Sequence, residues 1–271
     1  MKHLLLIGIG PGNPRQITLE AIDSLNRADV FFVLDKGAAK GDLLRLRKEL
    51  LERHVNRPYR LVQVEDPQRD AAAADYVGAV EDWHRQRAAL YGRLLHDELA
   101  EGQCGAFLLW GEPTLYDSTL RILERVAQPA FSLEVIPGIS SVQALAAAHR
   151  IALNRIGEPL HILPGRRLAD ESGIDNVVVM LDGQCAFAEL DDPHLHIYWG
   201  AYLGTADELL IEGPLMQVKA QILAQREQAR ARKGWIKDTY LLRRREAGSW
   251  PRSTGPCTGC SCGDGGAAWP R

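Results

Sequence analysis

The chain has 271 residues, of which 46% are hydrophobic and 25% charged, the balance of a globular protein rather than a disordered one. Its 32 basic and 35 acidic residues leave a formal net charge of −3, which does not indicate a general nucleic-acid-binding or membrane-surface protein. The five cysteines are unevenly spaced and three of them crowd near the C-terminus, so we expect a reducing compartment rather than a disulfide framework.

The N-terminus resembles a secretion signal only superficially. Its apolar stretch, Leu4–Gly10, is short, no small-residue cleavage site follows it, and Pro11 and Pro14 interrupt what comes next. No later uncharged apolar run reaches the ~18–20 residues that cross a bilayer. We therefore expect a cytoplasmic protein with no membrane partner.

The first half of the chain alternates short apolar runs with helical periodicity. Strands are predicted at 4–9, 30–34, 106–110 and 133–136, helices at about 18–25, 43–54 and 120–126, and one or two helices across 71–100. Thr18 is placed to cap the first helix, in which Leu19, Ile22 and Leu25 recur at helical spacing. This alternation predicts an α/β fold whose first sheet is open, doubly wound and mostly parallel.

The second half predicts another α/β unit. Helices are expected at 142–149 and 215–232, and strands at 160–163, 177–181, 196–199 and 239–242. We expect domains at 1–138 and 139–246. Residues 247–271 are rich in Gly, Pro and Ser and have no periodicity, which predicts a disordered or non-native tail.

Deletion of residues 249–271 is expected to leave the unfolding temperature and the ligand affinity unchanged, because the tail has no periodic apolar face to pack. The spacing of Cys257, Cys260 and Cys262 is that of a metal half-site, but zinc takes four ligands and no histidine follows His196. A melting curve of the truncated protein checks this. A drop of several degrees, or loss of a bound metal, would show that the tail is structural.

Four sequence features fall at the carboxyl ends of predicted parallel strands, where open α/β sheets bind ligands. They are Gly8–Gly12, Asp35, Trp110–Pro113 and Pro137–Ser141. The first lacks the last glycine of a dinucleotide fingerprint, since Asn13 stands there. Together the four suit an adenosine-like ligand, although Ser140 or Ser141 also reads as a helix cap.

The tracts GIGPGNP, ITLEAI, ADVFFVLD, WGEPTLYDSTL and VIPGISS, in that order, resemble the tetrapyrrole (precorrin) methylase family over about residues 3–246. The resemblance implies S-adenosylmethionine bound in a cleft between two α/β domains, a tetrapyrrole substrate and, usually, a homodimer. The tracts YVGAVEDWHRQR, HRIALNRIGEPLHILPGRR and VVVMLDG are similar to members that methylate precorrin-5 at C-1 and release acetate in aerobic cobalamin biosynthesis.

The resemblance also implies the residues that contact the cofactor. They are Gly10, Pro11, Gly12, Trp110, Gly111, Glu112, Leu115, Ser140, Ser141, Leu181, Asp182 and Gly204. The sequence departs from the family at Glu112, where Asp is usual, and at Leu181-Asp182, where many relatives carry Met-Gly.

Methyl transfer from a sulfonium needs mainly alignment of the attacking carbon, the methyl group and the leaving sulfur, so no metal site is expected. Loss of an acyl group to water needs a base. Asp35, which matches a carboxylate proposed as the proton acceptor in some relatives, is the first candidate, the alternative being an exposed turn residue. Tyr116 is the second candidate together with Asp117, although LYDST also reads as a helix N-cap with a buried tyrosine.

A tetrapyrrole carries many carboxylates, so the substrate side of the cleft should hold basic residues. Arg166 and Arg167 are the best pair for bidentate binding. Four further basic residues are conceivable helpers, but are expected rather as solvated surface charges: Lys36, Arg69, His84 and Arg87.

Three other functions remain open. The chain could methylate a different ring carbon, or be a non-catalytic adenosine-binding module, against which the tract PGRR counts. It could also modify RNA or protein, given the basic residues in Arg226–Lys237 and Arg243–Arg245. Interleaving with Glu227 favours a solvated helix face instead, so no nucleic-acid partner is expected.

Overall fold

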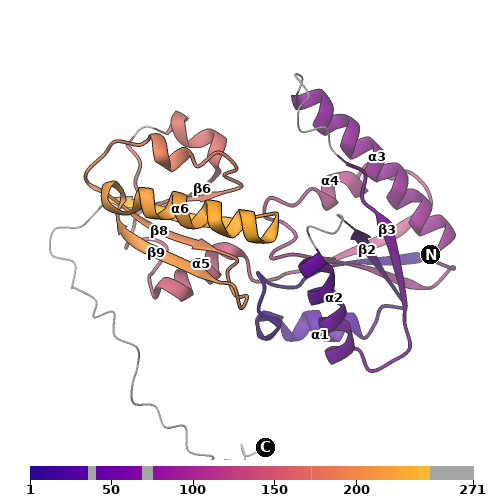
Figure 1. Ribbon diagram of the computed structural model, residues 1–271. Coiled ribbons are helices and arrows are strands. Elements are labelled where there is room, and N and C mark those ends of the chain that lie inside the picture. The colour runs from indigo at the N-terminus through magenta and orange to yellow at the C-terminus, as the bar shows by residue number, and fades with distance from the viewer. Residues whose placement is uncertain (36–40, 69–75, 172, 245–271) are drawn as a thin grey trace, which may run out of the picture.

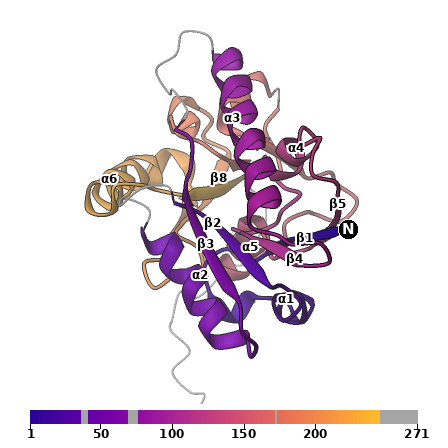
Figure 2. The same ribbon diagram turned by 90° about the vertical axis from the view of Figure 1, so that its right-hand side faces the viewer.

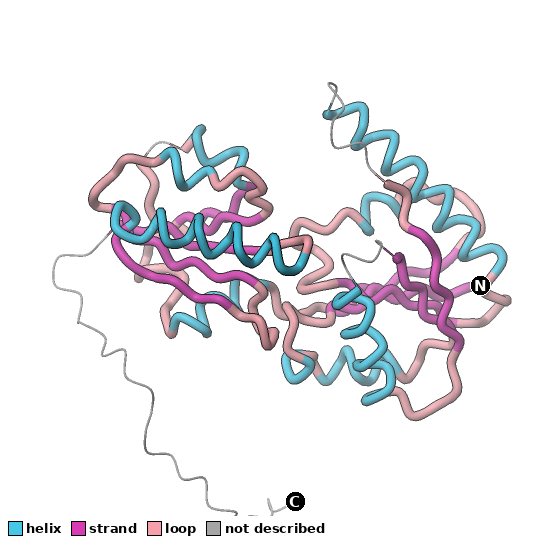
Figure 3. The backbone as a smooth tube through the Cα atoms, in the orientation of Figure 1, coloured by secondary structure: helices cyan, strands magenta, loops and turns pink. Residues whose placement is uncertain are grey.

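A computed structural model describes residues 1–35, 41–68, 76–171 and 173–244. The described chain forms two five-stranded sheets, one built from each half of the sequence (Figures 1 and 3). The predicted tail lies outside the described residues. No helix in the described ranges combines the length and the apolar character that a membrane crossing requires.

The first sheet is entirely parallel, in the order β3-β2-β4-β1-β5. Its strands are β1 (Lys2–Gly8), β2 (Val30–Asp35), β3 (Arg60–Glu65), β4 (Cys104–Leu109) and β5 (Phe131–Ile136). The central strands are apolar and buried along almost their whole length, as parallel strands covered on both faces must be. The predicted parallel sheet is confirmed.

Helices cover both faces of this sheet (Figure 2). On one face, α1 (Leu19–Leu25) and α2 (Gly41–His54) pack against side chains such as Ile7 and Phe31. On the other, α3 (Tyr76–Asp97) and α4 (Thr119–Leu123) pack against side chains such as Leu6 and Phe107. The Thr18 hydroxyl accepts a hydrogen bond from the Ala21 amide and so caps α1, as the sequence predicted.

The second sheet is mixed, in the order β6-β7-β10-β8-β9, with β6 and β7 parallel and the other neighbours antiparallel. Its strands are β6 (His161–Pro164), β7 (Val177–Met180), β8 (Leu195–Ala201), β9 (Leu209–Pro214) and β10 (Asp238–Arg244). Helix α6 (Leu215–Lys233) covers one face through Leu215, Ile222 and Ala229, and α5 (Ser141–His149) covers the other.

Two strands were not predicted, β3 and β9. Both are half-exposed edge strands, and the apolar run of each is short and is interrupted by polar residues or glycine. One helix, α3, is described in the Ala-rich region, in agreement with the expected one or two, and residues 69–75 before it lie outside the described ranges.

Candidate active site

Three loops meet at the carboxyl edge of the first sheet. Gly10, after β1, forms an isolated β-bridge with Gly111, after β4, with N···O distances of 3.4 and 2.9 Å. Gly138, after β5, packs against this bridge, since a Cβ built on it would lie 2.2 Å from the Gly111 carbonyl oxygen. No side chain fits at that contact, so glycine is required there.

The Glu112 carboxylate ties two of these loops together. Its Oε1 accepts hydrogen bonds from the Thr114 amide at 2.8 Å and the Thr114 hydroxyl at 2.6 Å, and its Oε2 accepts one from the Gly138 amide at 2.7 Å. Burial opposes ionisation, but these hydrogen bonds hold the pKa of Glu112 below its ordinary value. The longer acid at this position therefore stabilises the loops, and its oxygens are already occupied.

The turn that holds Gly12 touches the turn that holds Gly204, in the other half of the chain. A Cβ on Gly12 would lie 2.5 Å from Cγ2 of Thr205, and a Cβ on Gly204 would lie 2.8 Å from Oε1 of Gln16. Gly204 has a φ of +77°, a conformation that favours glycine. The two halves thus approach each other almost backbone to backbone at this point.

A cavity of about 670 Å³ opens between the two halves beside these loops. Its described lining includes seven aromatic residues: Phe32, Trp83, Tyr91, Phe107, Trp110, Tyr116 and Trp235. It also includes five basic residues: Arg47, Arg87, Arg226, Arg230 and Lys237. Asp117 is the single acidic residue in the described lining. The cavity therefore combines aromatic walls with a strongly cationic lining.

Two of these cations are held in place by the fold: Arg226 is buried and Arg47 is partly buried. Arg47 of α2 donates from Nε to the Leu108 carbonyl oxygen at 2.9 Å, and burial lowers the pKa of Arg47 to about 10. Arg226 of α6 pairs through Nε with Oδ2 of Asp238 at 2.9 Å. Burial raises the pKa of Asp238, an effect that Arg226 opposes. These side chains are parts of the cavity wall and not solvated surface charges.

A second cavity, of about 250 Å³, adjoins the first. Trp110 and Trp235 line both, and Gly12 and Gly204 line the smaller one. Lys237 lies over the Trp110 ring, with Nζ 5.6 Å from the ring centre. The two cavities therefore meet at Trp110 and Trp235.

Of the two candidate catalytic residues, Tyr116 is in the described lining of the larger cavity and Asp35 is not. Asp35 ends β2 next to Leu34, which lines the larger cavity, and its Oδ2 accepts a hydrogen bond from Nε2 of Gln63 at 2.9 Å. Tyr116 lines the cavity and donates its hydroxyl to the Ile162 carbonyl oxygen at 2.9 Å. Partial burial raises the pKa of Tyr116, which keeps it a donor.

Several predicted cofactor residues have side chains that are already engaged. Ser140 caps α5 and accepts from the Val142 amide, while Ser141 accepts from the Thr239 hydroxyl at 2.9 Å. The buried Asp182 carboxylate accepts from the Tyr240 hydroxyl and the Ala186 amide, both at 2.7 Å. At these positions a cofactor would meet backbone and shape rather than a free polar side chain.

Of the other predicted cofactor residues, some line the larger cavity and some lie in the loops beside it. Leu115 and Leu181 line the larger cavity, and the φ of Leu181 is +54°. Gly10, Pro11, Gly111 and Glu112 support its edge without lining it.

The predicted substrate-binding pair is exposed and does not line either cavity. Arg167 pairs with Asp170 at 3.1 Å in a short 3₁₀ helix, Gly165–Asp170, and Arg166 neighbours it. Arg166 still acts electrostatically on Tyr116, so this pair lies near the rim.

The expected solvated charges are wrong at three positions. Arg87 and His84 are buried in α3, and Arg226 is buried in α6, where we expected an exposed basic face. Arg87 and Arg226 line the larger cavity. Helical spacing in the sequence indicated this burial, because Arg87 lies one turn from both Trp83 and Tyr91, and Arg226 lies one turn from Ile222. Lys36 and Arg69 lie outside the described residues.

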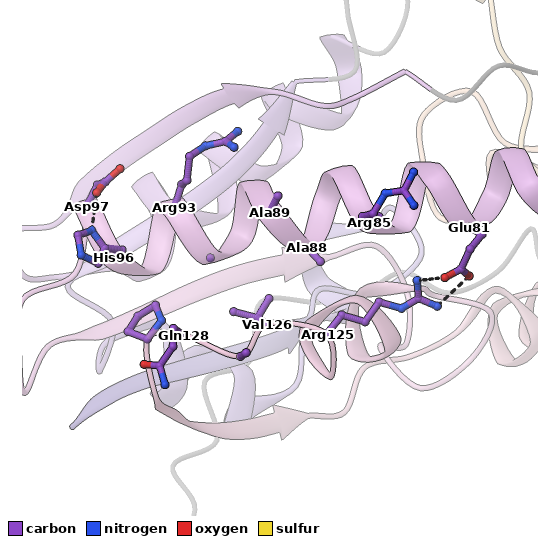
Figure 4. A pocket seen from close by; sticks show the side chains of 13 residues that line it. Glu81, Arg85, Ala88, Ala89, Arg93, His96, Asp97, Arg125, Val126 and Gln128 are labelled. Carbon is purple, nitrogen blue, oxygen red and sulfur yellow. Dashed lines mark hydrogen bonds and ion pairs between the residues drawn. The ribbon is translucent and has the colours of Figure 1, made fainter.

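A further groove, of about 640 Å³, runs along α3 beside residues 125–129 and is drawn in Figure 4. Its rim carries the ion pair between Arg125 and Glu81, at 2.5 and 3.0 Å, and its floor includes Ala88 and Gly92. No predicted site residue lines this groove. The cavities between the two halves are therefore the candidate site.

Known proteins resemble the chain in sequence and in fold. A precorrin-6A synthase [deacetylating] from Sinorhizobium sp is 50% identical over 250 residues, covering 90% of this chain and 96% of that protein. A crystal structure of a cobalamin synthesis-related protein, CobF, from Corynebacterium diphtheriae has a TM-score of 0.77 and 39% identity, covering 90% of this chain and 99% of that one.

A uroporphyrin-III C-methyltransferase from Thermus thermophilus, solved in complex with S-adenyl homocysteine, has a TM-score of 0.53 at 18% identity, which shows the shared fold. It covers 89% of this chain and 92% of that one. Residues 3–219 match the family Tetrapyrrole (Corrin/Porphyrin) Methylases. That match covers well over half of the chain, and the first sheet, the second sheet and the cleft between them agree with it. The chain belongs to the tetrapyrrole methylase family.

Proposed function

We propose that the protein is an S-adenosylmethionine-dependent C-methyltransferase of aerobic cobalamin biosynthesis. It methylates precorrin-5 at C-1 and releases acetate, giving precorrin-6A. The observation that carries the proposal is the 50% identity to a precorrin-6A synthase [deacetylating] across 96% of that protein's length.

The larger cavity fits a tetrapyrrole. The substrate is a broad, partly apolar macrocycle with many carboxylates on its rim, and it needs aromatic walls and separated cations rather than one anion site. The described lining supplies both, and Asp117 is its one acidic side chain. An apolar adenosine-binding module would not need five basic residues around its cavity.

The cofactor residues fit a ligand held mainly by backbone. A Cβ on Gly111 would meet nothing nearer than 4.0 Å, so there is room for a ligand atom beside it. The buried Oε1 of Gln16, near Gly204, has no hydrogen-bond partner in the described structure and could accept from a ligand. When bound there, the cofactor supplies an electrophilic methyl group.

The chain's own groups serve the loss of acetate. Asp35 takes a proton from a water molecule while the oxygen of that water adds to the acetyl carbonyl carbon. The carbon–carbon bond between the acetyl group and C-1 then breaks. The electron pair of that bond stays on the macrocycle, and C-1 becomes the carbon nucleophile that receives the methyl group. Tyr116, held as a donor, stabilises negative charge that develops on an oxygen nearby.

Anaerobic incubation of the protein with precorrin-5 and methyl-labelled S-adenosylmethionine tests the proposal. We expect labelled tetrapyrrole and acetate in equal amounts. Methyl transfer without acetate would move the activity to another ring carbon. Absence of both products would overturn the proposal.

Gly111→Arg is expected to abolish binding of S-adenosylhomocysteine, because its side chain would fill the space beside the loop. The positive φ of +78° at Gly111 also strains any side chain, so a matched control is needed. Gly102→Arg supplies it, since Gly102 has a φ of +81°, open space around it and no place at the site. Calorimetry should show binding by the control alone, unaffected by a chelator. Undiminished binding by Gly111→Arg would remove this loop from the site.

The remaining properties stay predictions. We propose a homodimer in the cytoplasm with a small-molecule tetrapyrrole as substrate, no resident metal ion and no nucleic-acid or membrane partner. Homology to the family supports the dimer, and analytical ultracentrifugation measures it. Within the described residues, no cluster of three or more His, Cys, Asp or Glu could hold a metal ion.

A further inference from the structure

The side chain of Arg87 is held rigidly in the wall of the larger cavity. Its Nε lies 2.8 Å from Oδ1 of Asp66, which follows β3, and both side chains are only 6% exposed. The centre of its guanidinium lies 4.6 Å from the Trp83 ring centre and 5.5 Å from that of Tyr91. Trp83 is itself fixed, because its Nε1 donates to the Pro67 carbonyl oxygen at 2.8 Å.

These contacts leave one side of the guanidinium available to a ligand. Asp66 forms an ion pair with Nε that does not have hydrogen-bond geometry, and the Ser118 hydroxyl lies 3.5 Å from Nη1, the outer limit of a hydrogen bond. In the described part of the chain, no hydrogen bond is made at Nη2. The pair Nη1 and Nη2 is the edge with which arginine binds a carboxylate in a bidentate manner.

A second arginine faces the same cavity from the opposite face of the sheet. Arg47 comes from α2 and Arg87 from α3, and these helices cover opposite faces (Figure 2). The apolar side chains of Phe32, Leu34 and Leu109 line the same cavity. Two cations with apolar side chains in the same wall suit a macrocycle with carboxylates on its rim.

We propose that Arg87 binds one rim carboxylate of the tetrapyrrole through Nη1 and Nη2, and that Arg47 binds a second. Asp66 is the positioning residue, because its carboxylate fixes the orientation of the Arg87 fork. This inference rests on the proposed function for the identity of the substrate. It assigns substrate recognition to residues of α2 and α3 in place of the exposed Arg166 and Arg167.

Uroporphyrin, a stable polycarboxylated tetrapyrrole, serves as the probe, and its binding is followed by quenching of tryptophan fluorescence. Arg87→Lys keeps a cation beside Asp66 but loses the fork, so we expect uroporphyrin affinity to fall by about tenfold or more. KM for precorrin-5 should rise in parallel. The affinity for S-adenosylhomocysteine and the unfolding temperature should stay close to those of the unaltered protein.

Three further variants test the positioning role of Asp66 and the specificity of the effect. Asp66→Asn should raise KM for precorrin-5 and leave kcat nearly unchanged, and Asp66→Glu should recover part of the loss. Arg85→Met is the matched control, because Arg85 lies on the same helix, is exposed and pairs with its helix neighbour Asp82. It should change none of these quantities.

The outcomes separate this inference from the proposed function. If the unaltered protein binds uroporphyrin through Arg87 but does not methylate precorrin-5, the proposed function fails and the carboxylate subsite stands. If the protein is active and Arg87→Lys keeps its KM and its uroporphyrin affinity, the subsite is overturned. Equal loss of uroporphyrin and S-adenosylhomocysteine binding would also overturn it, since Arg87 would then support the whole site.

Discussion

Asp35→Asn is expected to reduce turnover by about a hundredfold or more, while S-adenosylhomocysteine affinity stays within a few-fold of its original value. The amide keeps the size and polarity of the side chain and can still accept the hydrogen bond from Gln63. It cannot take a proton from water near neutral pH, so the effect should fall on kcat. Steady-state kinetics with precorrin-5 and calorimetry with the cofactor product give the two quantities.

Glu65→Gln is the matched control for this experiment. Glu65 is paired with Asp35 in register at the ends of β2 and β3, and it is exposed. The Glu65→Gln variant should retain full activity. Full activity of Asp35→Asn would make Asp35 a bystander and direct attention to Tyr116, Asp117 and Asp182. Loss of cofactor binding at unchanged saturated turnover would instead make Asp35 a cofactor contact.

Asp238→Ala is expected to lower the free energy of unfolding by about 3–5 kcal/mol. The substitution leaves the guanidinium of Arg226 without its carboxylate, although the Arg226 side chain is only 9% exposed. It also removes the acceptor for Nε1 of Trp199, which lies 3.0 Å from Oδ2 of Asp238. A buried charge and a buried indole N–H both lose their partner, and urea titration measures the sum.

Asp170→Ala provides the comparison for this loss of stability. Asp170 pairs with Arg167 in the same half of the chain, but both side chains are more than half exposed. Its removal should change the free energy of unfolding by no more than about 1 kcal/mol. Similar losses for both variants would show that water reaches Arg226 and compensates its charge.

The spacing of apolar residues was enough to locate most helices and strands, because burying one or both faces of an element requires apolar residues at regular positions. β1 and β4 are covered on both faces, so their sequences are unbroken apolar runs, and α1 carries its own capping residue. β9 lies at a sheet edge, and its apolar run of Leu209, Leu210 and Ile211 ends at Glu212 and Gly213, which is too short to indicate a strand by itself. Strand order and the antiparallel direction of β10 depend on contacts between distant segments, and no local pattern encodes them.

The part of the site that the backbone forms could be predicted from the sequence, whereas the cationic side chains of the cavity could not. Gly138 must be glycine because a Cβ there would meet the Gly111 carbonyl oxygen, and Gly10 and Gly111 both have a φ of +78°, which favours glycine. Arg87 and Arg226 looked like surface charges, because residue type alone favours exposure for arginine. Their burial depends on Asp66, which follows β3, and on Asp238, the first residue of β10, because these carboxylates supply the opposite charge.

The turns that hold Gly12 and Gly204 bring the two halves of the chain into direct contact, with no free space for a side chain at either glycine. A Cβ at Gly12 would lie 2.5 Å from Cγ2 of Thr205 and 2.8 Å from the Leu203 carbonyl oxygen, so even alanine there requires the two turns to shift. Both glycines also line the smaller cavity, which meets the larger one at Trp110 and Trp235. A methyl group at this contact would therefore disturb the junction of the two halves and the smaller cavity together, with no change in the wall of the larger cavity.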